Sequence, residues 1–162
     1  MKIENQSKAG AIIILIGRQH SGKSPIAKRL AAQSVYKNKI VLDLRKEYDS
    51  NEFTIFYNIA SFKKLLAWIK NSFIIVEEAT TFINSYKNFS FVEAAAGVEH
   101  NANTIIFIFH SVADAPHYLL RLARYVILLP TNDDRERIKR SHPKIYPYLG
   151  KKEDIYIDLN EL

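Results

Sequence analysis

The sequence contains no cysteine, which excludes disulfide bonds and thiolate metal sites. It also lacks any long apolar run. The longest, "AIIILI" at 11–16 and "TIIFIF" at 104–109, are far shorter than the roughly 20 residues that a membrane-spanning helix needs. The chain does not open with a signal-peptide pattern. We therefore expect a cytoplasmic protein without a membrane segment.

Composition and charge narrow the class of protein. A hydrophobic content of 48% with 25% charged residues is typical of a soluble globular protein, and 162 residues predict one domain over 1–162, except for a flexible stretch at 1–8. The net charge of +6 favours a polyanionic partner such as nucleic acid. The cations are dispersed, however, so a solvated basic surface stays an equal alternative. Their clusters lie at 28–29, 63–64, 135–140 and 151–152.

Residues 17–25, "GRQHSGKSP", match the pattern G-x-x-x-x-G-K-S/T of phosphate-binding loops. The apolar run before Gly17 predicts a buried strand. The segment after Ser24 predicts a helix, because Pro25 suits a first turn and apolar residues recur at helical spacing. Backbone N–H groups of such a loop and the positive end of the helix converge on an anion. We therefore favour a nucleotide site over a simple turn that contains a lysine by chance.

ATP with Mg²⁺ is the expected ligand of this loop. Lys23 is expected to reach the β- and γ-phosphates, and Ser24 is expected to bind the magnesium ion. The predicted nucleotide-binding residues are Gly17, Arg18, Gln19, His20, Ser21, Gly22, Lys23, Ser24 and Pro25.

Two adjacent glutamates follow the next predicted buried strand, in "SFIIVEEAT" at 72–80. ATP hydrolysis needs a carboxylate near magnesium and a group that positions the attacking water. Ligands bind at the carboxyl ends of strands in open α/β sheets. We therefore expect Glu77 to hold magnesium and Glu78 to activate water. The alternative is a pair of solvated glutamates at a helix start, where the dipole favours acids.

A histidine follows a further apolar strand, in "NTIIFIFHS" at 103–111. His110 is expected to sense the γ-phosphate or the attacking water, because either ring nitrogen can form a hydrogen bond. The alternative is a histidine that caps the following turn. The other histidines have no partner at metal-ligand spacing, which predicts the absence of a zinc site. They are His20, His100, His117 and His142.

The remaining segments alternate between strands and helices. We expect strands at 39–45, 53–59 and 124–130, an edge strand at 153–159, and helices at 61–70 and 114–123. Alternation of this kind implies crossover connections between parallel strands. The predicted fold class is α/β, a three-layer P-loop NTPase fold with a mainly parallel central sheet flanked by helices.

The order of these segments resembles the FtsK/HerA superfamily of DNA-pumping ATPases, which includes viral genome-packaging ATPases and Zot-like proteins of filamentous phages. The resemblance covers roughly residues 10–132. It rests on "GRQHSGKS", on "IVLDLRKEYDS", on "FIIVEEATTFI", and on the "HS" strand end followed by a helix and "ARYVILL".

This resemblance implies a ring-shaped homo-oligomer that moves double-stranded DNA in a host cytoplasm or virion. It makes Lys23 and Ser24 the residues that bind phosphate and magnesium. Glu77 and Glu78 become the Walker B pair, and His110 takes a sensor position that is often glutamine in relatives.

An arginine precedes the sensor strand in many relatives, whereas "GVEHNAN" at 97–103 contains none. Arg121 and Arg124 are then the nearest candidates for an arginine donated to a neighbouring subunit, and we expect them near the nucleotide-binding edge of the sheet. Otherwise they are surface arginines. Two other functions stay open beside the DNA-translocating ATPase: a nucleotide-gated interaction module with little turnover, and a small-molecule or nucleoside kinase. A kinase usually needs an arginine-rich lid, and the paired glutamates suit water activation better.

Overall fold

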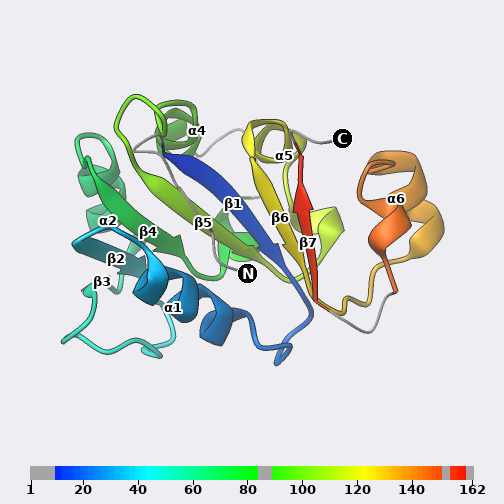
Figure 1. The fold of residues 1–162 in the computed structure, drawn as a ribbon, viewed down its shortest axis with the longest axis horizontal. Helices are drawn as coiled ribbons and strands as arrows, with labels where there is room; N and C mark the ends of the chain where they lie inside the picture. Colours follow the sequence, from blue (N-terminus) through cyan, green and yellow to red (C-terminus); the bar gives the residue numbers. More distant parts are fainter. Residues whose placement is uncertain (1–9, 84–88, 151–153, 160–162) are drawn as a thin grey trace.

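A computed structural model describes residues 10–83, 89–150 and 154–159. Their strands form one seven-stranded sheet in the order β3-β2-β4-β5-β1-β6-β7 (Figure 1). The pairs are parallel except for β6 and β7, which are antiparallel. The strands are β1 Ala11–Ile16, β2 Asn38–Leu42, β3 Thr54–Phe56, β4 Ser72–Val76, β5 Thr104–Phe109, β6 Tyr125–Leu128 and β7 Ile155–Asp158. The predicted α/β class with a mainly parallel sheet is confirmed.

Helices cover both faces of this sheet. The α1 helix crosses in front of the strands in Figure 1, and its Ile26 and Leu30 belong to one apolar layer. Phe62 of α2, Phe91 of α4 and Leu119 of α5 belong to the layer on the opposite face. The helices are α1 Lys23–Gln33, α2 Ile59–Leu66, α3 Ala79–Phe82, α4 Phe89–Ala96, α5 His117–Leu122 and α6 Arg135–Ser141, with short 3-10 helices η1 Val112–Asp114 and η2 Tyr146–Tyr148.

The unbroken apolar sequence of β1 suits its position inside the sheet, where both of its faces are covered. Ile12, Ile14 and Ile16 pack into the layer that contains α2 and α5, whereas Ile13 and Leu15 pack into the layer that contains α1. Side chains alternate between the faces of a strand, so a strand covered on both faces needs apolar residues throughout. The register of β1 against β5, Ala11 opposite Thr104 and Ile16 opposite Phe109, brings the ends of both strands to one edge.

Element boundaries differ from the predicted ones for local reasons. The expected helix at 61–70 begins earlier, at Ile59, because the Asn58 side chain caps it by accepting the N–H of Ser61. The same cap confines the expected strand at 53–59 to Thr54–Phe56. The helix also ends earlier, at Leu66, ahead of Asn71, whose φ of 50° is left-handed.

Two helices, α4 and α6, have no counterpart among the elements expected from the sequence. The α6 helix begins at an N-cap, because Asp134 accepts the N–H groups of Glu136 and Arg137. The stretch at 1–8 and the cations at 151–152 lie outside the described residues. In the part that is described, no helix is both long enough and apolar enough to cross a bilayer.

Candidate nucleotide-binding site

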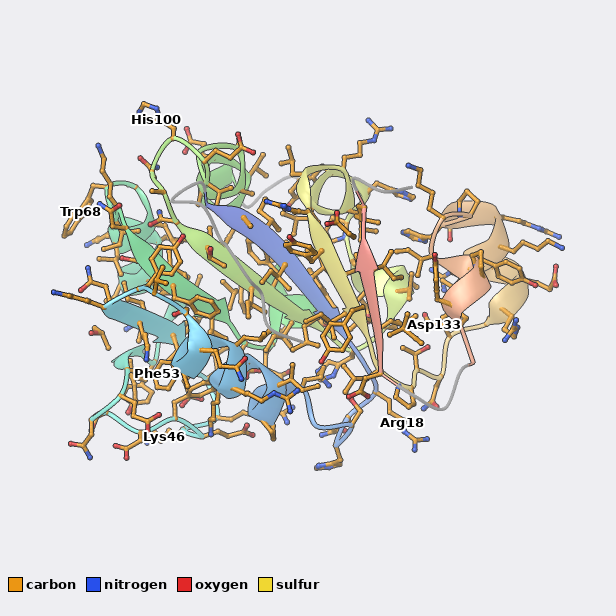
Figure 2. All side chains as sticks on the ribbon, in the orientation of Figure 1. Arg18, Lys46, Phe53, Trp68, His100 and Asp133 are labelled. Carbon is orange, nitrogen blue, oxygen red and sulfur yellow. The ribbon has the colours of Figure 1, made fainter. Side chains whose placement is uncertain are left out.

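A cavity of about 310 Å³ lies where β1, β2, β4 and β5 end. Residues 19–25 line it from the loop after β1 and the first turn of α1, and Glu77, Glu78 and His110 line it from the ends of β4 and β5. Figure 2 shows Arg18 of this loop at the carboxyl edge of the sheet, whereas His100 lies toward the amino edge. The cavity therefore occupies the edge where ligands bind in open α/β sheets.

The loop has the backbone geometry of an anion cradle. Gly22, with φ 91°, precedes the first residue of α1, Lys23, and His20 also has a left-handed φ of 61°. The first N–H groups of a helix have no partner inside the helix, so those of α1 face outward at the loop. A Cβ atom on Gly17 would lie 2.4 Å from Ser21 Oγ and 2.8 Å from Leu129 Cβ. The close approach of the chain therefore requires glycine at this position.

Lys23 is a buried cation that spans the loop. Its Nζ donates hydrogen bonds of 2.8 Å to the carbonyl oxygens of Gly17 and Arg18, and it lies 3.5 Å from His110 Nδ1. Burial lowers the pKa of Lys23, and the nearby carboxylates of Glu77 and Glu78 act in the opposite direction. The Lys23 ammonium is therefore a poorly solvated donor, and a bound anion would stabilise its positive charge.

Glu77 is buried at the end of β4 and is held by two hydroxyls. The Tyr48 phenol donates to Glu77 Oε1 at 2.5 Å, and Ser24 forms a hydrogen bond with the same carboxyl group. Burial raises the pKa of Glu77, while these two hydrogen bonds lower it.

The oxygen atoms of Ser24 and Glu77 are ligands of the type that Mg²⁺ prefers, so this pair fits a magnesium–nucleotide complex. Across the described ranges, no group of three or more His, Cys, Asp or Glu residues forms a metal site. The remaining ligands of a bound ion would therefore come from phosphate and water, which is the usual arrangement for Mg²⁺.

Glu78 has a strained backbone and a doubly paired carboxylate. Its φ of 53° and ψ of 33° are left-handed, which is uncommon for glutamate and costs about 1 kcal/mol or more. Oε1 pairs with Arg45 Nε at 3.0 Å, and Oε2 pairs with His110 Nε2 at 2.9 Å. Neither glutamate is solvated, since Glu77 is 7% exposed and the side chain of Glu78 is 12% exposed.

The His110 ring faces the cavity from the end of β5. An imidazole with its proton on Nε2 satisfies both contacts, because Nε2–H can donate to Glu78 while Nδ1 faces the Lys23 ammonium. The backbone N–H of His110 donates to Thr80 Oγ1. The cap of the following turn is Ser111 instead, whose Oγ accepts the N–H of Asp114.

Three residues at the end of β2 join the site, and sequence reasoning gave them no role. The expected strand at 39–45 stops at Leu42 because the Asp43 carboxylate accepts the N–H groups of Arg45 and Tyr48. The resulting turn directs Arg45 toward Glu78 and Tyr48 toward Glu77. One feature of the sequence could have indicated these residues: Asp43 lies near the carboxyl end of a predicted strand. In the structure that strand, β2, pairs with β4, the strand that precedes the two glutamates.

Arg121 and Arg124 are not at the expected edge. The Arg124 N–H donates to the carbonyl of Ile12, near the start of β1, and the parallel strand β6 begins at the next residue. Arg121 lies in the last turn of α5, which leads to that point. The expectation that both lie near the nucleotide edge of their own chain was wrong, because α5 runs back across the sheet before β6 begins.

The structure has close neighbours among solved proteins, although neither a known protein-family model nor a curated protein matches the sequence. The genome packaging NTPase B204 from Sulfolobus turreted icosahedral virus 2, in complex with sulfate, has a TM-score of 0.77 at 18% identity, over 94% of this chain and 93% of that chain. The same protein in complex with ATP-gammaS has a TM-score of 0.71 at 18% identity, over the same shares. This chain has the P-loop NTPase fold.

A further neighbour comes from the second group that the sequence resembles. The N-terminal domain of zonular occludens toxin from Neisseria meningitidis has a TM-score of 0.56 at 14% identity, over 93% of this chain and 93% of that chain. The resemblance to viral genome-packaging and Zot-like proteins is therefore confirmed by structures of both kinds, and at these identities it shows the fold.

Proposed function

We propose that this chain binds and hydrolyses ATP as a P-loop ATPase. The observation that carries the proposal is the convergence of Lys23, Ser24, Glu77, Glu78 and His110 from separate elements on one cavity at the carboxyl edge of the sheet. The complex of the B204 neighbour with ATP-gammaS supports a triphosphate ligand for this fold.

The residues that line the cavity have different roles in this proposal: phosphate binding, magnesium binding and activation of the attacking water. Bound MgATP supplies the reactive γ-phosphoryl group. The N–H groups at the start of α1 and the Lys23 ammonium bind phosphate oxygens. To do so, Lys23 gives up its hydrogen bonds to the carbonyl oxygens of Gly17 and Arg18. Ser24 and Glu77 hold magnesium. Glu78 accepts a proton from the attacking water, and His110 orients that water or the γ-phosphate.

We further propose that the ATPase is a DNA packaging or translocation motor of a phage or mobile element, assembled as a ring and working in a host cytoplasm or virion. The genome-packaging neighbour and the net charge of +6 support this role. An arginine donated by a neighbouring subunit, Arg121 or Arg124, stays part of the proposal. A ring can bring the amino edge of one subunit to the nucleotide of the next.

A nucleotide-gated interaction module is the second candidate. Both carboxylate oxygens of Glu78 are paired, with Arg45 and His110, so the residue that would activate water is restrained. An ATPase with little turnover, in which ATP orders a partner-binding surface, fits that restraint.

Nucleotide binding and phosphate release test these proposals. Lys23→Ala should abolish MgATP affinity with the fold intact, whereas Arg29→Ala, which removes an exposed cation from the same helix, should leave it unchanged. Glu78→Gln should bind ATP and lose most turnover. Unchanged affinity in Lys23→Ala would overturn the nucleotide site.

The DNA and ring proposals need separate measurements. Phosphate release should rise when double-stranded DNA is added, and the effect should weaken with salt. The molecular mass should increase with a non-hydrolysable ATP analogue. ATP binding without DNA stimulation, assembly or turnover would favour the interaction module.

A further inference from the structure

Arg45 is placed at the wall of the cavity by its own backbone. Its N–H donates to Asp43 Oδ1 at 3.1 Å, in the turn that the Asp43 carboxylate organises after β2. The side chain lines the main cavity with Lys23 and His110, and it lines a smaller adjoining pocket with Arg18 and His110. Arg45 therefore places a cation in the wall of the cavity, beside the phosphate-binding loop.

The Arg45 guanidinium has N–H donors that its ion pair with Glu78 does not use. In the described residues, Arg45 forms its ion pair through Nε, with Glu78 Oε1 at 3.0 Å, and its side chain is 44% exposed. An arginine presents five N–H donors in a planar fork that matches the oxygen atoms of a phosphate group. The terminal nitrogens can therefore bind a second anion in the cavity.

The positions of the charges make Glu78 and a phosphate competitors for Arg45. Arg45 lies close enough to Lys23 for its charge to lower the pKa of that lysine, so both cations act on the same region. An anion beside Lys23 attracts Arg45 and repels Glu78. A nucleoside diphosphate lacks the terminal charge that would compete at this position.

We propose that Arg45 recognises the γ-phosphate of a bound nucleoside triphosphate in its own chain, and in doing so releases Glu78 Oε1. The inference rests on the proposed ATPase function. It makes Arg45 the residue that distinguishes triphosphate from diphosphate. It also makes the Arg45–Glu78 pair a restraint on the water-activating carboxylate that lasts until ATP binds.

Affinities for a non-hydrolysable ATP analogue and for ADP, measured by calorimetry with Mg²⁺, test the assignment without turnover. Arg45→Ala should weaken the ATP analogue by about 10- to 100-fold, the range of a hydrogen bond to a charged group. It should change ADP affinity by less than about threefold. Arg45→Lys should retain part of the preference, because it keeps the charge and loses the fork. The control is Lys46→Ala, which removes an exposed neighbouring cation that lies over Tyr57 and should leave both affinities unchanged.

A double-mutant cycle tests the competition itself. Glu78→Gln should tighten the ATP analogue, because it removes both the competitor for Arg45 and a negative charge near the phosphate. In an Arg45→Ala background only the charge effect is left, so the gain should be smaller there. A gain of equal size in both backgrounds would overturn the competition, and equal losses for the ATP analogue and ADP in Arg45→Ala would overturn γ-phosphate recognition. Absence of nucleotide binding by the wild-type chain would instead refute the ATPase function on which the inference rests.

Discussion

The Tyr48 phenol donates a 2.5 Å hydrogen bond to the buried carboxylate of Glu77, and thereby links the turn after β2 to the magnesium-binding candidate after β4. The pairing of these two strands places Leu42 opposite Val76, so both residues leave the sheet at the same level. Tyr48 is itself fixed by its N–H bond to Asp43 and by edge-to-face packing on Phe53. Glu77 is thus oriented before any ion binds.

Removal of that hydroxyl should cost stability and magnesium affinity together. Tyr48→Phe keeps the ring contact with Phe53 but leaves a buried carboxylate with one donor fewer, which costs about 1–3 kcal/mol of unfolding free energy. It should also raise the pKa of Glu77 further, since the Tyr48 hydrogen bond lowers it. Urea unfolding and a magnesium titration of nucleotide binding measure the two effects.

The control for this prediction is Tyr57→Phe, because Tyr57 is 53% exposed. That variant should match the wild type in both measurements. Equal stability and magnesium dependence in Tyr48→Phe and wild type would show that the hydroxyl does not orient Glu77.

Glu77→Gln should stabilise the free protein more at high pH than at low pH. Burial raises the folded-state pKa of Glu77 above its ordinary value of 4.5, so the folded state binds more protons than the unfolded state between those two values. The Glu77 contribution to the unfolding free energy therefore falls as pH rises through that window. Glutamine does not titrate, yet it can still accept the Tyr48 hydrogen bond.

Unfolding of Glu77→Gln and wild type at several pH values from about 4.5 upward measures this difference. The stability advantage of the variant should grow with pH and then level off above the folded-state pKa. A constant difference over the whole range would mean that Glu77 does not have a raised pKa.

Asn103 should be a large stability determinant without a role in nucleotide binding. Its buried side chain accepts the N–H of Ser72 and donates to the carbonyl of Ile69, at the amino edge of the sheet. Asn103→Ala leaves both backbone groups unpaired and should cost about 2–4 kcal/mol. Gln33→Ala, which truncates an exposed amide on α1, should change stability by less than about 0.5 kcal/mol.

Denaturant midpoints and nucleotide affinity should separate these effects. Under conditions in which Asn103→Ala remains folded, its affinity for ATP should equal that of the wild type, because the residue lies at the opposite edge from the cavity. A stability loss below about 1 kcal/mol would mean that other groups satisfy the two backbone partners.

Catalysis completed between subunits predicts complementation in mixtures. An Arg121→Ala, Arg124→Ala double variant should lose turnover, since an arginine supplied in trans is worth about 10³–10⁵ in rate in GTPases. It should regain turnover when mixed with Glu78→Gln, which keeps its arginines and can donate them. Specific activity of the wild type should also rise with protein concentration.

The matched control for that mixture is an Arg137→Ala, Arg140→Ala double variant without DNA, because these exposed arginines of α6 have the same spacing. It should retain wild-type turnover. Activity that does not depend on concentration, together with no rescue in the mixture, would rule out an arginine in trans and leave a monomeric ATPase or an interaction module.

The sequence predicted the parts of the site that follow from strand and loop patterns. Residues 17–22 connect a buried strand to the helix that begins at Lys23, and the sequence motif predicted both elements. Glu77 and His110 could be placed at one edge because each follows a predicted strand of a parallel sheet, and the observed register of β4 against β5 agrees with that placement. Arg45 and Tyr48 could not be placed in this way, because a side-chain turn around Asp43 directs them and no periodicity encodes that turn.

The error over Arg121 and Arg124 has a different physical origin. Their spacing predicts a shared helix face, but it does not fix how far along the sheet the helix has returned when it ends. That distance is set by the η1 turn and by the length of α5, and the sequence pattern did not resolve the η1 turn from the helix.

The central position of β1 has a consequence for how the chain folds. Its partners β5 and β6 are far along the sequence, with Ile16 opposite both Phe109 and Leu128. During synthesis β1, which is entirely apolar, therefore cannot pair with β5 or β6 until most of the chain has been made. Long-range parallel pairing of this kind is slow, and exposed apolar segments aggregate. We therefore expect refolding yield to fall with protein concentration, and fragments that end before β5 to be insoluble.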